Sequence, residues 1–291
     1  MTKTYALFLG CYIPALQPFA EASLRKIAPS LKLKFMEMEG ATCCPVPEIV
    51  RLADHDAWLY VSARNLALAE ALGNDIMVVC NGCWETLHET REVLLKDNEK
   101  LAEVNSKLKL LDREYTGKSE VKHFLEVIIE EVGLQALQAA VKERFTELTV
   151  AVQYGCKLYK SPNEKFVSYF DNILKALGVK VAEYGAEKIC CGFPLSLYSL
   201  DKATEERSRF KLEKMQAAKV DCIVTACPGC YDVLENAQLL LRRKGVRFDI
   251  PMLNLMELMA LSFGFKPEDI GFDRHRIKTD TLIAKIRPGG N

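Results

Sequence analysis

Two stretches of the chain carry the same cysteine motif in the same setting. Residues 78–87 read VVCNGCWETL, and residues 224–233 read VTACPGCYDV. Each has a short apolar run, then Cys-x-Gly-Cys, then an aromatic residue and a polar helix start. The similarity indicates that one structural unit is present twice, so the chain is expected to fold as two halves of one design.

The other cysteines extend this repeat. In each half a lone cysteine is followed by an adjacent cysteine pair, and the pair is followed after 35 residues by Cys-x-x-Cys. The first cysteine set is Cys11, Cys43, Cys44, Cys80 and Cys83, and the second cysteine set is Cys156, Cys190, Cys191, Cys227 and Cys230. Of the 11 cysteines only Cys222 lies outside the sets; within an apolar run, it is expected to be a core residue.

Apolar runs that precede the cysteines predict buried strands, and amphipathic segments between them predict helices. The expected strands are 5–10, 33–38, 76–79, 150–155, 179–184 and 222–225, and the expected helices are 19–27, 56–72, 167–177 and 202–218. Alternating strands and helices favour a parallel sheet with helical crossovers. The predicted fold is therefore α/β, with two pseudo-symmetric Rossmann-like parallel-sheet halves that each carry one cysteine set.

The predicted domains follow the repeat. Residues 1–148 form the first half, including a helical insertion at 84–148, and residues 149–291 form the second half with a C-terminal helical tail. Within the insertion, Val121, Phe124, Leu125 and Ile128 follow a helical stripe. Because parallel sheets place their sites at the C-terminal strand ends, each cysteine set is expected to converge at one sheet edge.

Charge and hydropathy exclude several classes of protein. Lys plus Arg and Asp plus Glu number 39 each, so no net charge favours nucleic acid or an anionic membrane. The N-terminus reads as a strand rather than a signal peptide, and the apolar stretch 252–265 is too short to span a bilayer. A soluble, cytoplasmic protein is expected, where a reducing environment disfavours structural disulfides.

Five cysteines in each half point to a metal group. Structural zinc takes four ligands, and two adjacent thiolates suit one tetrahedral ion poorly. A redox dithiol would use Cys-x-x-Cys but would leave the other cysteines unexplained. An iron–sulfur cluster has several metal atoms for adjacent thiolates. Gly82 and Gly229 are expected to adopt unusual dihedrals beside the metal group, with helices starting near Trp84 and Tyr231.

The pattern resembles the CCG cysteine-rich domain family. The motif is Cys-x(31–39)-Cys-Cys-x(35–36)-Cys-x-x-Cys, and two copies without a fused ferredoxin module resemble the B subunits of soluble heterodisulfide reductases of methanogens. FLGCYIP, CCPVPE, VVCNGC and CCGFPL carry this resemblance. The first copy departs from the motif because Pro45 stands where the second copy has Gly192. A different local backbone is therefore expected after the first cysteine pair.

The resemblance implies two noncubane [4Fe–4S] clusters, one on each cysteine set, with no flavin, nicotinamide or zinc. It implies reduction of the coenzyme M–coenzyme B heterodisulfide to two thiols, each cluster supplying one electron and binding one substrate sulfur. The implied partners are the ferredoxin-like C subunit and the flavin-containing A subunit of the same complex, with a hydrogenase or formate dehydrogenase upstream. Three alternatives stay open. They are another CCG oxidoreductase subunit, in hydroxy-acid, fumarate/succinate or sulfate-reducer disulfide metabolism; a zinc-binding structural or assembly protein; and a thiol–disulfide exchanger that works without metal.

Other residues are candidates for secondary roles. Those next to predicted ligands are expected to line the substrate site: Tyr12, Lys157, Phe193, Pro228 and Tyr231. Lys157 is the preferred contact for an anionic substrate group. Among the histidines, we expect His88 to be half-buried and structural, His55 to lie at the surface, His123 to lie off its helix's apolar stripe, and His275 to lie in a solvated or partner-binding tail.

Overall fold

The computed structural model describes residues 2–159 and 165–287, which form two compact units. The first unit contains Met1–Leu16 and Lys32–Val127, and the second unit contains Gln17–Leu31 and Ile128–Asn291. Packing therefore groups the chain differently from the sequence repeat, because residues 17–31 of the first half are part of the second unit. The predicted domain boundary between residues 148 and 149 separates the two sequence repeats, not the two packing units, and it stays a prediction.

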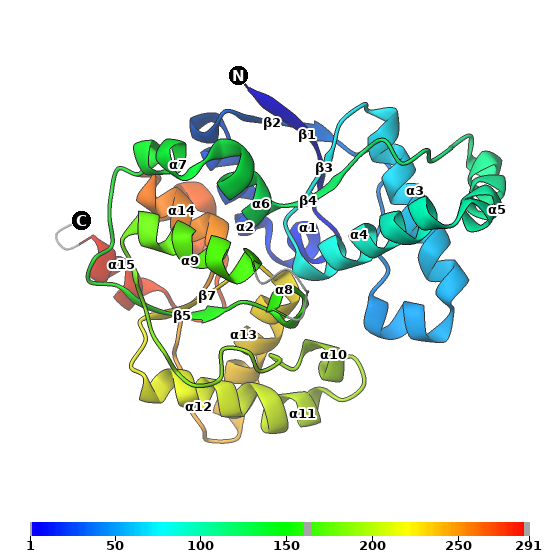
Figure 1. The fold of residues 1–291 in the computed structure, drawn as a ribbon. Helices are drawn as coiled ribbons and strands as arrows, with labels where there is room; N and C mark the ends of the chain where they lie inside the picture. The colour runs from blue at the N-terminus through cyan, green and yellow to red at the C-terminus, as the bar shows by residue number, and fades with distance from the viewer. Residues whose placement is uncertain (1, 160–164, 288–291) are drawn as a thin grey trace. The chain divides into compact units, whose positions relative to one another are not determined.

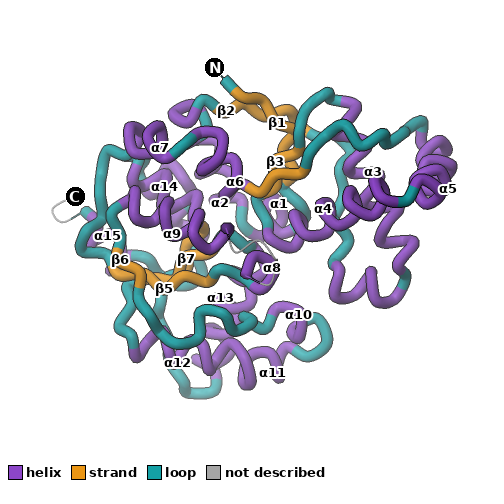
Figure 2. The backbone as a smooth tube through the Cα atoms, viewed as in Figure 1, coloured by secondary structure: helices purple, strands orange, loops and turns teal. Residues whose placement is uncertain are grey.

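Each unit is built on a four-stranded parallel sheet, coloured orange in Figure 2. The first sheet has the order β2-β1-β3-β4, and the second has the order β6-β5-β7-β8. The strands are β1 Lys3–Phe8, β2 Leu33–Glu37, β3 Ile76–Val78, β4 Val121–His123, β5 Thr149–Gln153, β6 Lys180–Val181, β7 Cys222–Thr225 and β8 Met252–Asn254. The two orders match, which confirms the predicted pair of pseudo-symmetric α/β halves.

Helices cross over between these strands, as Figure 1 shows. In the first unit they are α1 Tyr12–Leu16, α3 His55–Ala71, α4 Asn81–Lys96, α5 Asn98–Leu108 and α6 Phe124–Glu126, with short turns η2 Pro47–Arg51 and η3 Lys109–Leu111. Helix α3 packs on α4 and α5. Trp58 and Leu59 of α3 and Leu87 of α4 are almost wholly buried, so their apolar faces build the core of the unit.

The second unit has the larger set of helices. They are α2 Pro18–Ile27, α7 Leu134–Ala140, α8 Cys156–Tyr159, α9 Lys165–Leu177, α10 Phe193–Ser196, α11 Leu200–Ala203, α12 Arg209–Ala217, α13 Pro228–Arg243, α14 Leu255–Ser262 and α15 Asp280–Ile286, with short turns η1 Pro29–Leu31, η5 Thr204–Ser208, η6 Pro267–Ile270 and η7 Phe272–Arg274. The turn η4 Val127–Val132 begins at the last residue of the first unit. Helix α2 packs on α14, which explains its place in this unit.

One strand corrects the predicted helical insertion. Residues 121–123 form β4, which pairs with β3 from Ile76↔Val121 to Val78↔His123, so Val121 lies in a strand rather than on a helix. The same arrangement recurs in the second sheet, where β8 pairs with β7. A three-residue strand followed at once by a helix has too few residues to show a period of two. The helical stripe therefore masked the fourth strand.

Candidate functional site

The first cysteine set lies beyond the C-terminal ends of the strands in the first sheet, as expected. Cys11 follows β1, Cys80 follows β3, and the Cys43–Cys44 pair lies in the loop that leaves β2. Cys80 is the N-cap of α4, and Cys83 lies in the first turn of that helix. The positive end of the helix dipole therefore points at Cys80 and Cys83, where it favours a negatively charged group beside them.

The five thiols of the first set form a continuous row. Cys11 contacts Cys43, Cys43 contacts Cys44, Cys44 contacts Cys83, and Cys83 contacts Cys80. The Sγ atoms of Cys11 and Cys43 are 3.6 Å apart. The structure thus brings together all five predicted ligands of this half.

The second cysteine set repeats the row in the same order. Cys156 contacts Cys190, Cys190 contacts Cys191, Cys191 contacts Cys230, and Cys230 contacts Cys227. Cys227 is the N-cap of α13, as Cys80 is of α4. Exposure follows the same pattern, because the second cysteine of each pair and of each Cys-x-x-Cys is buried and the other three are half-exposed.

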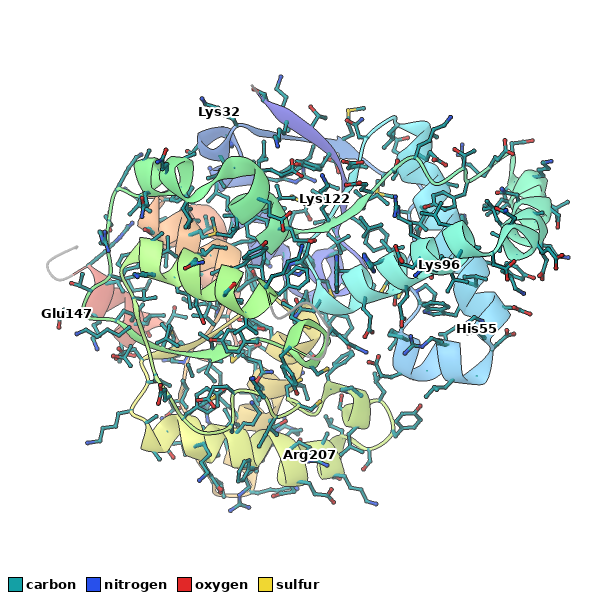
Figure 3. The ribbon with its side chains drawn as sticks, in the orientation of Figure 1. Lys32, His55, Lys96, Lys122, Glu147 and Arg207 are labelled. Carbon is teal, nitrogen blue, oxygen red and sulfur yellow. The ribbon has the colours of Figure 1, made fainter. Side chains whose placement is uncertain are left out.

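Two glycines with positive φ lie in crowded places next to cysteines of the two sets. Gly10 has φ +68°, and a Cβ atom at this position would lie 2.8 Å from Cys83 Sγ. Gly192, directly after the second cysteine pair, has φ +104°, and a Cβ there would lie 3.1 Å from the Cβ of Arg207, which Figure 3 labels. Proline is locked near φ −65°, so the Pro45 copy must follow a different path after its pair.

The Cys-x-x-Cys glycines behave differently from the expectation. Gly82 and Gly229 are absent from the positive-φ glycines of the described chain, because they lie in the first turns of α4 and α13. These helices begin at Asn81 and Pro228, three residues before the expected starts. A small residue is still needed at Gly229, where a Cβ would lie 3.1 Å from the Phe193 ring.

The thiols of the first row share protons unequally when they carry no metal. Hydrogen bonds from the Cys43 and Cys83 thiols lower the pKa of Cys44 to about 6. The bond that Cys11 makes with Cys43 raises the pKa of Cys11 well above its usual value. Cys44 is therefore mostly a thiolate at neutral pH. Soft thiolates crowded in this way suit a sulfur-rich metal group.

Polar side chains hold each cysteine pair in place. In the first unit Asn65 accepts a 3.0 Å bond from the backbone N–H of Thr42 and donates a 3.2 Å bond to the Cys43 carbonyl. In the second unit the Ser208 hydroxyl donates a 2.9 Å bond to the Cys191 carbonyl. Lys211 is fully buried, and its Nζ donates to the carbonyls of Ala186 and Ile189 in the loop before the second pair.

His123 is a site residue that sequence reasoning missed. It is fully buried at the end of β4, and its Nδ1 accepts a 3.2 Å bond from the Leu125 N–H. Its Nε2 therefore donates to Asn81 Oδ1 at 3.1 Å, inside the first Cys-x-x-Cys. Burial lowers the pKa of His123 to about 3, so the ring is neutral. A signal in the sequence could have found this segment, because the H-x-x-E capping box at 123–126 recurs as N-x-x-E at 254–257.

His275 corrects the expectation of a solvated tail. Its side chain is 1% exposed, and it contacts the Tyr231 hydroxyl at 2.9 Å and Glu257 Oε1 at 2.7 Å. The Phe19 ring of α2 stacks on it with ring centroids 4.7 Å apart. Burial alone would lower the pKa of His275, but the charge of Glu257 raises it above its usual value. The sequence around His275 is highly charged, so it gave no sign of burial.

The substrate-lining candidates separate into two groups. Tyr12, Lys157 and Phe193 are half-buried beside ligand cysteines, and Lys157 interacts electrostatically with Cys156. Pro228 and Tyr231 are buried, and the Pro228 carbonyl accepts a 2.9 Å bond from Gln17 Nε2. Pro228 and Tyr231 thus support the second cysteine set from within the core, and only the half-buried three retain a surface.

The remaining predicted residues have ordinary roles. His88 is half-buried and stacks on Trp84 with ring centroids 5.0 Å apart, as a structural histidine would. His55, labelled in Figure 3, is exposed at the start of α3. Cys222 is fully buried in β7, and burial raises the pKa of its thiol, so it is a core residue.

The donors fit a group that contains several metal atoms. The thiols of each set follow one another in a row, which offers separate sulfurs to separate metal atoms. Their soft chemistry, partial burial and helix N-termini all suit an anionic iron–sulfur group.

Comparisons with known proteins agree with this geometry. The family model described as CCG, cysteine-rich domain, matches residues 5–88 and 150–235. The chain is 34% identical over 97% of its length to a Methanosarcina acetivorans protein, of which it covers 96%; that protein is named as the B subunit of a ferredoxin/F(420)H(2)-dependent CoB-CoM heterodisulfide reductase. It is 30% identical, over 97% of its length and all of the relative, to the 8-methylmenaquinol:fumarate reductase membrane anchor subunit of Wolinella succinogenes.

A solved structure supports the fold alone. A hypothetical protein from Helicobacter pylori matches 95% of this chain with a TM-score of 0.77 and 18% identity, and the chain covers 52% of that protein. None of the described helices has both the length and the apolar character needed to cross a membrane.

Proposed function

The chain belongs to the CCG cysteine-rich domain family, and on that basis we propose that it is the catalytic iron–sulfur subunit of a heterodisulfide reductase. The observation that supports this most directly is the pair of matching five-thiol rows. Relatives that are 32–36% identical over nearly the whole chain are named as the B subunit of a heterodisulfide reductase or as a protein like it.

Each row would hold one noncubane [4Fe–4S] cluster, and all ten cysteines of the two sets would be ligands. When bound, each cluster would supply one electron and a binding point for one substrate sulfur. Reduction of the coenzyme M–coenzyme B disulfide takes up two electrons and two protons and breaks the S–S bond to give two thiols. Two one-electron groups therefore match one two-electron substrate.

The protein's own residues would prepare the site for this chemistry. The N-termini of α4 and α13 stabilise the negative charge of each row. Lys157 lies half-buried beside Cys156, where it would bind a sulfonate, carboxylate or phosphate of the substrate. Electrons would arrive from a ferredoxin-like protein and a flavin-containing protein of the same complex, since the sequence contains no flavin or nicotinamide motif of its own.

A second candidate function is fumarate reduction with a quinol as electron donor. It is favoured by the Wolinella succinogenes relative, which matches this chain over its whole length. In this case the chain would pass electrons through the same two cysteine sets to a partner that acts on fumarate. Both functions would use the same ten cysteines, so only the substrate that the protein turns over can distinguish them.

The test is elemental and then catalytic. Protein purified without oxygen should contain about eight irons and as much acid-labile sulfide for each chain, with little zinc. A reduced viologen dye should then drive cleavage of the coenzyme M–coenzyme B disulfide into two thiols. Zinc without sulfide would refute the proposal, and a full iron content without disulfide turnover would favour the second candidate.

A further inference from the structure

The two cysteine rows have the same ligands but different neighbours. The spacing from each cysteine pair to its Cys-x-x-Cys is identical, so residues in these segments match one to one, and Arg64 of α3 matches Lys211 of α12. Counting back from the lone cysteines, Phe8 of β1 matches Gln153 of β5. At both positions the second unit brings a group that can act on the sulfur atoms.

Gln153 is a buried amide donor beside a ligand of the second row. Its Nε2 lies 3.9 Å from Cys230 Sγ, and the side chain is fully buried. The Thr225 hydroxyl donates a 2.8 Å bond to the Gln153 carbonyl and fixes the backbone of this residue. Phe8, the matching residue in the first unit, is also buried but has no polar atom to offer.

Lys211 places a positive charge behind the same row. Its side chain is fully buried, and Nζ lies 2.9 Å from the Ile189 carbonyl and 5.2 Å from the centre of the Tyr184 ring. It interacts electrostatically with the thiols of Cys230 and Cys191. Burial lowers the pKa of Lys211 to about 8, so the side chain still carries most of its charge at neutral pH, and little water screens that charge.

Two charges oppose this difference between the rows, Arg64 in the first unit and Glu187 in the second, but neither reverses it. Arg64 is half-buried, so water screens more of its charge. Glu187 lies near Lys211, but it is half-exposed and accepts bonds from the backbone N–H groups of Tyr184 and Gly185. Backbone N–H groups reach thiols in both rows and do not distinguish them.

We infer that Gln153 and Lys211 make the redox group on the second cysteine set easier to reduce than the group on the first. A hydrogen bond to a ligand sulfur and a buried cation both stabilise the reduced, more negative state of an iron–sulfur group. The inference rests on the proposed function in assuming a redox group on each set. This difference in potential fixes the order of reduction, because the first electron occupies the second site and the next electron occupies the first site.

The experiment is an anaerobic redox titration followed by electron paramagnetic resonance on the full chain. The native protein should show two one-electron steps. Gln153→Met and Lys211→Met should each move only the higher step to more negative potential, by about tenfold in the one-electron equilibrium, or about 59 mV. A merely structural role would change folding or metal content but would leave the potential of the bound group in place.

Matched variants make the result decisive. Gln238→Met removes another fully buried glutamine of the second unit, whose amide bonds to Ile250 rather than to a sulfur, and it should leave both steps unchanged. Arg64→Met, at the matching position of the first unit, should leave the higher step unchanged. Lys211→Arg keeps the positive charge and should therefore have the native potential. It provides a folded comparison if Lys211→Met folds poorly.

Iron and sulfide are measured on every sample, so that failure of the proposed function can be told apart from failure of the inference about the two potentials. A native protein without iron or sulfide would refute the proposed function, and the inference with it. Iron-replete Gln153→Met and Lys211→Met variants with native potentials would refute the inference alone. So would a higher step that Arg64→Met moves and Lys211→Met does not.

Discussion

The first and second units have the same strand order and the same row of five thiols, yet they differ in polar groups near those thiols. In the first unit the buried, neutral His123 binds Asn81 between two ligands. In the second unit the same positions hold Asn254 and Pro228, and a histidine reaches the region from the C-terminal segment instead.

The comparison separates what the two sites share from what is individual to each. The strand order, the helix N-termini and the order of the cysteines are common to both units, so we assign these features to the proposed metal binding itself. The polar groups behind the ligands differ in charge and donor capacity, so they adjust each site. Four predictions test this division, in order of decreasing expected effect.

The largest effect should follow loss of a buried ligand in either unit. Cys83→Ser and Cys230→Ser are each expected to remove about half of the iron and to abolish disulfide turnover, because both clusters are needed for two electrons. Iron, sulfide and dye-driven turnover provide the measurement. Cys222→Ala is the matched control, since this buried cysteine lies outside both rows and should keep all of the iron. Full turnover by either ligand variant would refute equal roles for the two rows.

Removal of His275 should destabilise the second unit strongly. His275→Ala leaves the fully buried Glu257 without its partner, which typically costs about 3 kcal/mol. The pKa of His275 is raised in the folded state, so the charged pair stabilises fully below pH 6.5 and is lost as pH rises through that raised pKa. Urea unfolding at several pH values should therefore show a larger loss in acid than in base. His55→Ala, at an exposed position, should have little effect at any pH.

The backbone just after β1 comes close to Cys83 at Gly10. A side chain at this position should therefore disturb the first site and leave the second site intact. Gly10→Ala and Gly73→Ala both place alanine at a positive φ, +68° and +69°, which costs about 1–2 kcal/mol in each case. Only at Gly10 would the new Cβ lie against a ligand sulfur. Gly10→Ala should therefore also lose iron from the first site, whereas Gly73→Ala should retain it. Equal iron in the two variants would contradict the proposed packing.

The smallest effect near neutral pH is a pH dependence that distinguishes the two histidines. The pKa of His123 is lowered from 6.5 to about 3, so below pH 6.5 the unfolded chain takes up a proton that the folded chain does not. The free energy of unfolding should fall by up to about 1.4 kcal/mol for each pH unit below that value. His123→Asn, which introduces the residue found at the matching position 254, should remove this slope. A slope that survives the substitution would assign it to other groups.

The limits of sequence reasoning follow from the same comparison. Strand ends and cysteine spacing are local and repeated, so the strands β1, β3, β5 and β7 and the convergence of each set could be predicted. The strand β4 could not, because three residues are too few to show a period. Residues 17–31 lie in the first half of the sequence but pack on α14, and no local pattern reports such a distant contact.

By itself, the sequence determined that the chain has two α/β halves and ten cysteines placed beyond strand ends, because periodicity and spacing are properties of neighbouring residues. Only the tertiary structure decided which groups surround the thiols. Lys211 and His275 are charged residues in polar segments, and their burial depends on carbonyls and carboxylates from other parts of the chain. A buried charge is stable only when such partners are assembled around it, and folding alone brings them together.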